Sequence, residues 1–182
     1  TLPDTTVPIR FQNDAEVAIV GEGVYGVGRE YSRIIGLTLG TGCGSAFLID
    51  GVPQTQGKGV PTNGWVYQII YNGEPVDEIF STRGLLKRLA SASVNVDSVF
   101  DAVQQAETDL KIRAVLDSFG DDLAQFLKPL VAEFSANAVV LQGGIAQSFP
   151  YFADAMKPHL SIPILKGELE QDAALLGIAN LF

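Results

Sequence analysis

The chain has 182 residues, of which 47% are hydrophobic and 18% charged, a composition typical of a folded protein with a substantial core. Twelve basic and twenty-one acidic residues give a net charge of −9, which opposes the attraction that nonspecific nucleic-acid binding needs. No stretch of about 18 apolar residues is present and the single cysteine excludes an internal disulfide, so we expect a cytoplasmic location and neither membrane nor nucleic acid as a partner.

The first half of the chain is expected to form strands around one helix. The pattern predicts a strand over Val7 to Phe11, followed by a helix that Asn13 or Asp14 caps and that runs roughly to Gly28. Strands and turns should follow in this order: strands at 34–39 and 45–49, an Asp50-Gly51 turn into a strand near Val52, a loop at 56–64, a strand at 65–71 and an Asn72-Gly73 turn.

From Ser81 onward the pattern indicates helices, because apolar residues recur at helical spacing. The longest stripe consists of Leu123, Phe126, Leu127, Leu130, Val131 and Phe134. Pro129 is expected to bend this helix. The chain should end with a strand at 138–141, a helix at 151–157, a strand at 162–165 and a helix from Gln171. No repeat or linker interrupts this order, so one α/β domain over 1–182 is predicted.

The segment GTGCGSAF, at 40–47, places glycines at the tip of the predicted hairpin. Gly40, Gly42 and Gly44 leave backbone N–H groups open, and Thr41 adds a hydroxyl, so the turn could hold phosphate oxygens. A glycine-rich hairpin without a ligand is the alternative, because short glycine motifs recur by chance.

Five motifs follow one another in an order that resembles the second lobe of the ROK sugar kinases, within the actin-like ATPase superfamily. They are NDAE at 13–16, GTGCGSA at 40–46, STRGL at 81–85, QGGIA at 142–146 and DAALLG at 172–177. The resemblance covers nearly the whole chain. It implies an RNase H-like α/β domain with a mixed sheet and helices on both faces, and it leaves a homodimer open.

The family's kinases carry a DxGGT phosphate loop in a first lobe, and no such sequence occurs here. We therefore expect this chain to be a C-terminal lobe whose partner is its own N-terminal lobe. In such a kinase both lobes grip the ATP phosphates. The isolated chain is accordingly expected to fold but to be inactive.

The resemblance implies ATP-dependent phosphorylation of a sugar hydroxyl, with Mg²⁺ bridging the ATP phosphates. Asp14 would be the base that accepts the hydroxyl proton, and Asn13 would help to orient the sugar. The nucleotide would be held by two glycine-rich turns: Gly40, Thr41, Gly42 and Gly44 at the outer phosphates, and Gly143 and Gly144 at the adenosine side. The structural alternatives are a helix cap at 13–14 and a tight strand-to-helix turn at 143–144.

Two departures from the family concern the sugar and zinc. Hexose kinases of the family usually carry GExGH after the hairpin, whose Glu and His contact sugar hydroxyls, and Trp65 and Gln68 stand in those places here. The family's zinc segment is replaced by 71–78, without cysteine or histidine, so we expect no structural zinc and no glucose specificity. Asn63 and Gln68 could donate neutral hydrogen bonds to a sugar or be ordinary loop residues. Trp65 could stack on a pyranose, although a buried strand position is favoured.

Other functions stay open. A sugar-sensing transcriptional regulator of the same family, or a sugar-binding lobe without turnover, is favoured by the missing Glu and His, whereas Asp14 favours a kinase. A structural actin-like protein fits less well, because the Asn13-Asp14 pair would have no role in it. His159, the only histidine, is expected to be structural or solvent-facing, and Asp77-Glu78 to be a solvated pair.

Overall fold

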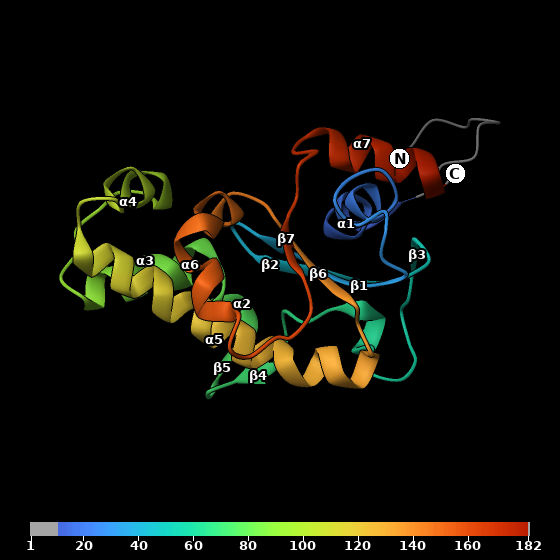
Figure 1. The fold of residues 1–182 in the computed structure, drawn as a ribbon, viewed down its shortest axis with the longest axis horizontal. Coiled ribbons are helices and arrows are strands. Elements are labelled where there is room, and N and C mark those ends of the chain that lie inside the picture. The colour runs from blue at the N-terminus through green and yellow to red at the C-terminus, as the bar shows by residue number, and fades with distance from the viewer. Residues whose placement is uncertain (1–10, 182) are drawn as a thin grey trace, which may run out of the picture.

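A five-stranded mixed sheet forms the centre of the computed structural model, which describes residues 11–181 (Figure 1). Its strands are β1 (Arg33–Leu39), β2 (Cys43–Ile49), β3 (Val52–Pro53), β6 (Ala138–Gln142) and β7 (Ile164–Lys166). They lie in the order β3-β2-β1-β6-β7, antiparallel from β1 to β3 and parallel from β1 to β7. The strand predicted at 7–11 falls outside the described residues except for Phe11, which is exposed and in no strand.

Helices cover both faces of this sheet (Figure 1). They are α1 (Asp14–Val24) and α7 (Asp172–Leu181) on one face, and α5 (Leu110–Phe134) and α6 (Phe149–Met156) on the other. Because successive strand residues point to opposite faces, Ile34 packs with Ile19 of α1, whereas Ile35 belongs to the core on the α5 side. The predicted α/β class, with a mixed sheet and helices on both faces, is confirmed.

The chain leaves the central sheet between β3 and β6. It forms a two-stranded ribbon of β4 (Ile70–Tyr71) and β5 (Glu74–Pro75), and then α2 (Val76–Ile79), α3 (Thr82–Ser91), α4 (Val99–Gln105) and α5. α5 continues through Pro129. Phe80, just after α2, packs edge-on against Phe119 of α5 with ring centroids 5.6 Å apart and also contacts Phe126 at 5.7 Å. These aromatic contacts fix α2 and α3 against α5.

The predicted strand at 65–71 is wrong except for its last two residues. Residues Thr62–Gly64 form a short 3-10 helix, and the chain then runs irregularly to Ile70. The cause is a side chain of β2: the buried Ser45 hydroxyl donates to Gly64 O at 2.7 Å and accepts the Val66 N–H at 3.0 Å. These backbone groups are thus satisfied by Ser45 rather than by a neighbouring strand.

Trp65 does not occupy the buried strand position that was favoured for it. It lies in the irregular segment, 37% of its surface is exposed, and its ring stands 5.9 Å from that of Tyr67. Stacking on a ligand is therefore sterically open to Trp65.

The first helix is shorter than predicted, ending at Val24 rather than near Gly28. The N–H groups of Gly26 and Gly28 both donate to the Glu22 carbonyl oxygen, at 3.2 and 2.8 Å, and this ends the helix.

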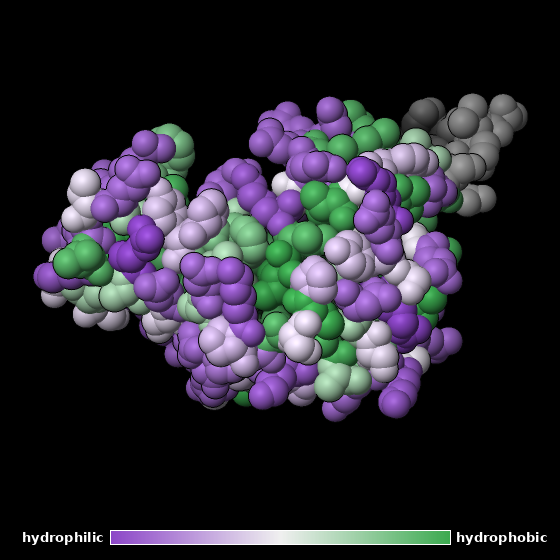
Figure 2. All heavy atoms as spheres, in the orientation of Figure 1, coloured by the Kyte–Doolittle hydropathy of each residue, from purple (hydrophilic) through white to green (hydrophobic). Residues whose placement is uncertain are grey.

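The edge strand β7 is only partly buried along its length. Figure 2 shows apolar residues at the surface in the middle of the face that is drawn. No helix within residues 11–181 has the length and apolar character needed to cross a membrane.

Candidate active site

At the start of α1, the side chain of Asn13 caps the helix and the carboxylate of its neighbour Asp14 does not. Asn13 Oδ1 accepts the Glu16 N–H at 3.0 Å, the N-cap interaction, with extended backbone angles at Asn13. Asp14 is the first helical residue and is exposed, and its Oδ1 accepts the Ala15 N–H at 2.8 Å. The capping expected for this pair is confirmed, and Asn13 performs it. The Asp14 side chain is thus available for another role.

A cavity of about 470 Å³ lies beside Asp14. It is lined by the start of α1, by Thr38 of β1, by Gln142, Gly143 and Gly144 at the end of β6, and by the segment between β7 and α7. β1 and β6 are parallel neighbours, with Thr38 opposite Gln142, so their carboxyl ends meet at this edge. The sheet therefore brings Asp14 and the Gly143-Gly144 turn together, although 129 residues separate Asp14 from Gly143 in the sequence.

A side chain at Gly143, in the lining of this cavity, would strain the backbone. The φ of Gly143 is +96°, and a Cβ there would lie 2.5 Å from the carbonyl oxygen of Leu39. Gly144, by contrast, has φ −60° and nothing within 4 Å of an added Cβ. Gly143 thus lets the end of β6 approach the end of β1, while Gly144 leaves open space in the cavity wall.

The cavity's outer wall, residues 166–171, is held by a buried carboxylate. Glu22 is fully buried in α1, and its Oε1 accepts the Leu169 N–H at 2.8 Å. Gln142 Nε2 donates to Glu170 O at 3.1 Å and so ties the same segment to β6. Sequence reasoning missed Glu22, although a Glu flanked by apolar and small residues in the second half of this helix is a usable signal, because a buried polar group needs partners.

The GTG turn, residues 40–44 at the junction of β1 and β2, lies next to this cavity and does not line it. Among residues 11–181, the lining includes Asp14, Gly143 and Gly144 but none of the residues 40–44. Gly44 packs the hairpin onto the start of α1, since an added Cβ would lie 2.4 Å from both the Ala15 Cβ and the Thr38 Oγ1. An added Cβ at Gly40 would meet nothing within 4 Å, and Thr41 is exposed.

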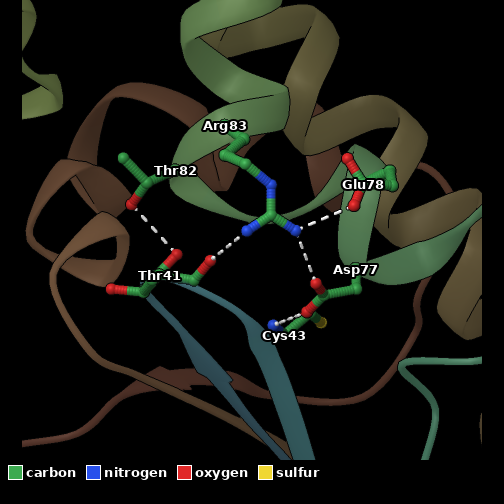
Figure 3. A network of polar contacts seen from close by, with 7 residues as sticks. Thr41, Cys43, Asp77, Glu78, Thr82 and Arg83 are labelled. Atoms are coloured by element: carbon green, nitrogen blue, oxygen red, sulfur yellow. Dashed lines mark hydrogen bonds and ion pairs between the residues drawn. The ribbon is translucent and has the colours of Figure 1, made fainter.

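α2 and the start of α3 hold the GTG turn from the other side (Figure 3). Asp77 Oδ1 accepts the Cys43 N–H at 2.7 Å, and Asp77 Oδ2 pairs with Arg83 Nη2 at 2.8 Å. The same Arg83 nitrogen also pairs with Glu78 Oε1 at 2.8 Å. The expectation that Asp77-Glu78 is merely a solvated pair is therefore wrong. No local sequence signal indicates this contact, because 34 residues separate Cys43 from Asp77.

A family model described as ROK family matches residues 3–182. The chain belongs to the ROK family. A glucokinase from Thermotoga maritima is 25% identical over 208 aligned positions, covering 93% of this chain and 64% of that protein. A xylose repressor from Bacillus subtilis is 25% identical over 194 positions, covering 96% of this chain and 50% of that protein. The ROK chain thus spans between half and two thirds of these curated relatives.

The structural comparison agrees with the family. A ROK family glucokinase from Streptomyces griseus, solved in complex with glucose and AMPPNP, has a TM-score of 0.75 at 19% identity, covering 96% of this chain and 68% of that one. The ROK chain therefore has the actin-like ATPase fold that the resemblance implied. The relatives of this chain include both a glucokinase and a xylose repressor, so family membership alone does not separate catalysis from regulation.

The two neutral residues proposed to bond a sugar, Asn63 and Gln68, lie in and after the short 3-10 helix Thr62–Gly64. Asn63 is exposed with a left-handed backbone, φ 58°, and Gln68 is also exposed. In the described part of the chain, neither contributes to the lining of the Asp14 cavity. A role of Asn63 and Gln68 at the sugar therefore stays a prediction.

We predict that this ROK protein binds no structural zinc, because its two soft donors are unsuited to it. Burial, and then the neighbouring Asp77, raise the pKa of the Cys43 thiol to about 12, so it stays protonated. His159 Nε2 is 2.6 Å from Asp121 Oδ1, and this bond holds the pKa of Asp121 below its ordinary value. Metal analysis of the purified protein checks the prediction. Stoichiometric zinc that survives chelation would contradict it.

Proposed function

We propose that this chain is the C-terminal lobe of an ATP-dependent sugar kinase in which Asp14 accepts the proton of the attacking sugar hydroxyl. The observation that carries the proposal is the position of Asp14, which lines the same cavity as Gly143 and Gly144. A carboxylate base beside a turn that admits a nucleotide is the arrangement that phosphoryl transfer to a hydroxyl requires.

The glycine-rich turns would serve the nucleotide. The open space at Gly40 and Gly144 allows phosphate oxygens or the adenosine side to approach the backbone closely. Gly40, Thr41 and Gly42 would face the outer phosphates, and Gly143 and Gly144 the rest of the nucleotide. Mg²⁺ bound with ATP would neutralise part of the charge that develops on the transferred group.

Asn13 would position the start of α1, and Asp14 would accept the proton of the sugar hydroxyl. The hydrogen bond from the Glu16 N–H fixes the Asn13 side chain and the first turn of α1, which in turn places Asp14. In phosphoryl transfer the protein contributes mainly position and charge, so a base held by a capped helix suits the reaction. The remaining contacts to ATP and sugar would come from the N-terminal lobe of the full-length protein.

The sugar preference should differ from that of glucose-specific relatives. Charged hydrogen-bond partners typically contribute about 1.5 to 3 kcal/mol each, so replacing a Glu and a His by Trp65 and Gln68 changes affinity about ten-fold to more than a hundred-fold per lost partner. The exposed Trp65 ring would favour a sugar with an apolar face. An ADP-release assay of the full-length protein against a panel of sugars measures the preference. Glucose emerging as clearly the best substrate would contradict it.

A sugar-sensing regulator is the second candidate, favoured by the similarity to the xylose repressor over 96% of this chain. Such a protein would bind sugar in the same cleft without transferring phosphate. The ADP-release assay with added sugar, combined with calorimetric sugar binding, separates the candidates. Sugar-dependent ADP release supports the kinase, and sugar binding without ADP release supports the regulator.

A further inference from the structure

The hydrogen bonds of the GTG turn point almost entirely toward α3 and the segment before it. The Gly40 carbonyl accepts from the Thr82 N–H at 2.7 Å and from Thr82 Oγ1 at 2.9 Å. The Thr41 carbonyl accepts from Arg83 Nη1 at 3.4 Å. Within the turn itself, the Gly40 N–H donates to Gly42 O at 3.0 Å. The start of α3 therefore binds two consecutive carbonyl groups of the turn (Figure 3).

These carbonyl contacts determine where two N–H groups of the turn point. In a planar trans peptide, the carbonyl of one residue and the N–H of the next point in opposite directions. Holding the Gly40 carbonyl on α3 therefore turns the Thr41 N–H away from α3, and holding the Thr41 carbonyl on Arg83 does the same to the Gly42 N–H. Neither N–H has an acceptor among residues 11–181, and Thr41 is exposed.

Arg83 has a second effect, on charge. Asp77 is needed to fix the Cys43 N–H, but its carboxylate and that of Glu78 would repel a phosphate at the turn. One Arg83 nitrogen lies 2.8 Å from an oxygen of each carboxylate, so the guanidinium lowers the net charge of this group from −2 to −1. The guanidinium is suited to this position because its planar fork can reach the two carboxylates and the Thr41 carbonyl together.

We propose that Arg83, with Thr82 and Asp77, is a positioning residue that presents the Thr41 and Gly42 N–H groups to the outer phosphates of the nucleotide. Arg83 need not touch the nucleotide, because it acts through the turn. The inference rests on the proposed kinase function. It adds that nucleotide affinity depends on the contact between the hairpin and the α2–α3 segment, and that sugar affinity does not.

The test compares Arg83→Gln and Lys87→Gln in the full-length protein. Lys87 lies one turn further along α3 and pairs with Glu74 at 3.1 Å, and among residues 11–181 it has no hydrogen bond to the turn. Lys87→Gln therefore loses the same charge as Arg83→Gln, with one ion pair in place of the two of Arg83. Arg83→Gln should weaken binding of a non-hydrolysable ATP analogue about ten-fold, and raise the KM for ATP similarly, with the KM for sugar unchanged. Lys87→Gln should match the wild type in its affinity for the analogue, its KM for ATP and its KM for sugar.

Further variants and measurements keep the outcomes distinct. Thr82→Val, which keeps the backbone N–H and loses only Oγ1, should weaken nucleotide binding by a smaller factor, and it serves if Arg83→Gln does not fold. Arg83→Lys should recover only part of the affinity, because one ammonium cannot span the three acceptors. Amide NMR signals of Thr41 and Gly42 should shift on adding the analogue to wild type, and less in Arg83→Gln.

The two proposals fail in different ways. If the wild type binds no ATP analogue, the kinase proposal fails. If the wild type binds it and Arg83→Gln binds it equally well, or if Arg83→Lys restores wild-type affinity completely, the positioning role of Arg83 is wrong.

Discussion

Replacing Asp14 by asparagine should lower the turnover of the full-length protein by about 10² to 10⁴, the usual share of a positioned base. The amide is nearly isosteric with the carboxylate but cannot accept the hydroxyl proton. Because Asn13 rather than Asp14 caps α1, the helix should keep its N-cap hydrogen bond and the variant its stability. Nucleotide binding should also be retained. A coupled ADP-release assay and thermal unfolding measure the two effects.

Asp172→Asn is the matched control for this variant. Asp172 is likewise the first residue of its helix, α7, and does not line the cavity that Asp14 shares with Gly143. The same loss of one first-turn carboxylate should leave turnover unchanged there. An Asp14→Asn enzyme with wild-type turnover would remove Asp14 from the chemistry.

Replacing Gly143 by alanine should destabilise the protein and abolish nucleotide binding together. An alanine at φ +96° is strained, and its Cβ would lie 2.5 Å from the Leu39 carbonyl oxygen, which belongs to the backbone of a central strand and cannot move aside. The two effects should cost about 2 to 4 kcal/mol, which lowers Tm by roughly 4 to 16 °C for a protein of this size. Thermal unfolding and calorimetry with a non-hydrolysable ATP analogue measure the outcome.

Gly144→Ala is the neighbouring control, because an added Cβ there meets nothing within 4 Å and φ is −60°. It should keep the wild-type Tm. If the nucleotide approaches this backbone closely, Gly144→Ala should nevertheless weaken its binding. A Gly143→Ala protein with the wild-type Tm would show that the contact between the ends of β1 and β6 tolerates a side chain.

The sequence pattern predicted those elements whose backbone hydrogen bonds are made within one helix or with the next strand along the chain. The hairpin of β1 and β2 follows from two short apolar runs on either side of a glycine turn, and α5 follows from its apolar stripe. The first helix was placed correctly at its start because Asn13 caps it there. Its end was misplaced, because the glycines after Val24 fold the backbone back onto Glu22 O instead of extending the helix.

Contacts between distant segments account for what could not be predicted. The segment at 65–69 has the composition of a strand, but the Ser45 hydroxyl, about 20 residues earlier, binds its backbone and holds it irregular. Asp77 and Arg83 meet the GTG turn where Phe80, between α2 and α3, packs against Phe119 and Phe126 of α5. The outer wall of the cavity depends on Glu22 and Leu169, which are 147 residues apart.

The most direct test of the kinase proposal is ³¹P NMR of the full-length protein incubated with ATP, Mg²⁺ and the sugar that binds best. We expect a sugar phosphomonoester signal to grow as the γ-phosphate signal of ATP falls, to grow at least a hundred-fold more slowly with Asp14→Asn, and not to appear with the isolated chain. A wild-type protein that binds the sugar but forms no phosphomonoester, or an Asp14→Asn protein that forms it at the wild-type rate, would contradict the proposed role of Asp14 in phosphoryl transfer.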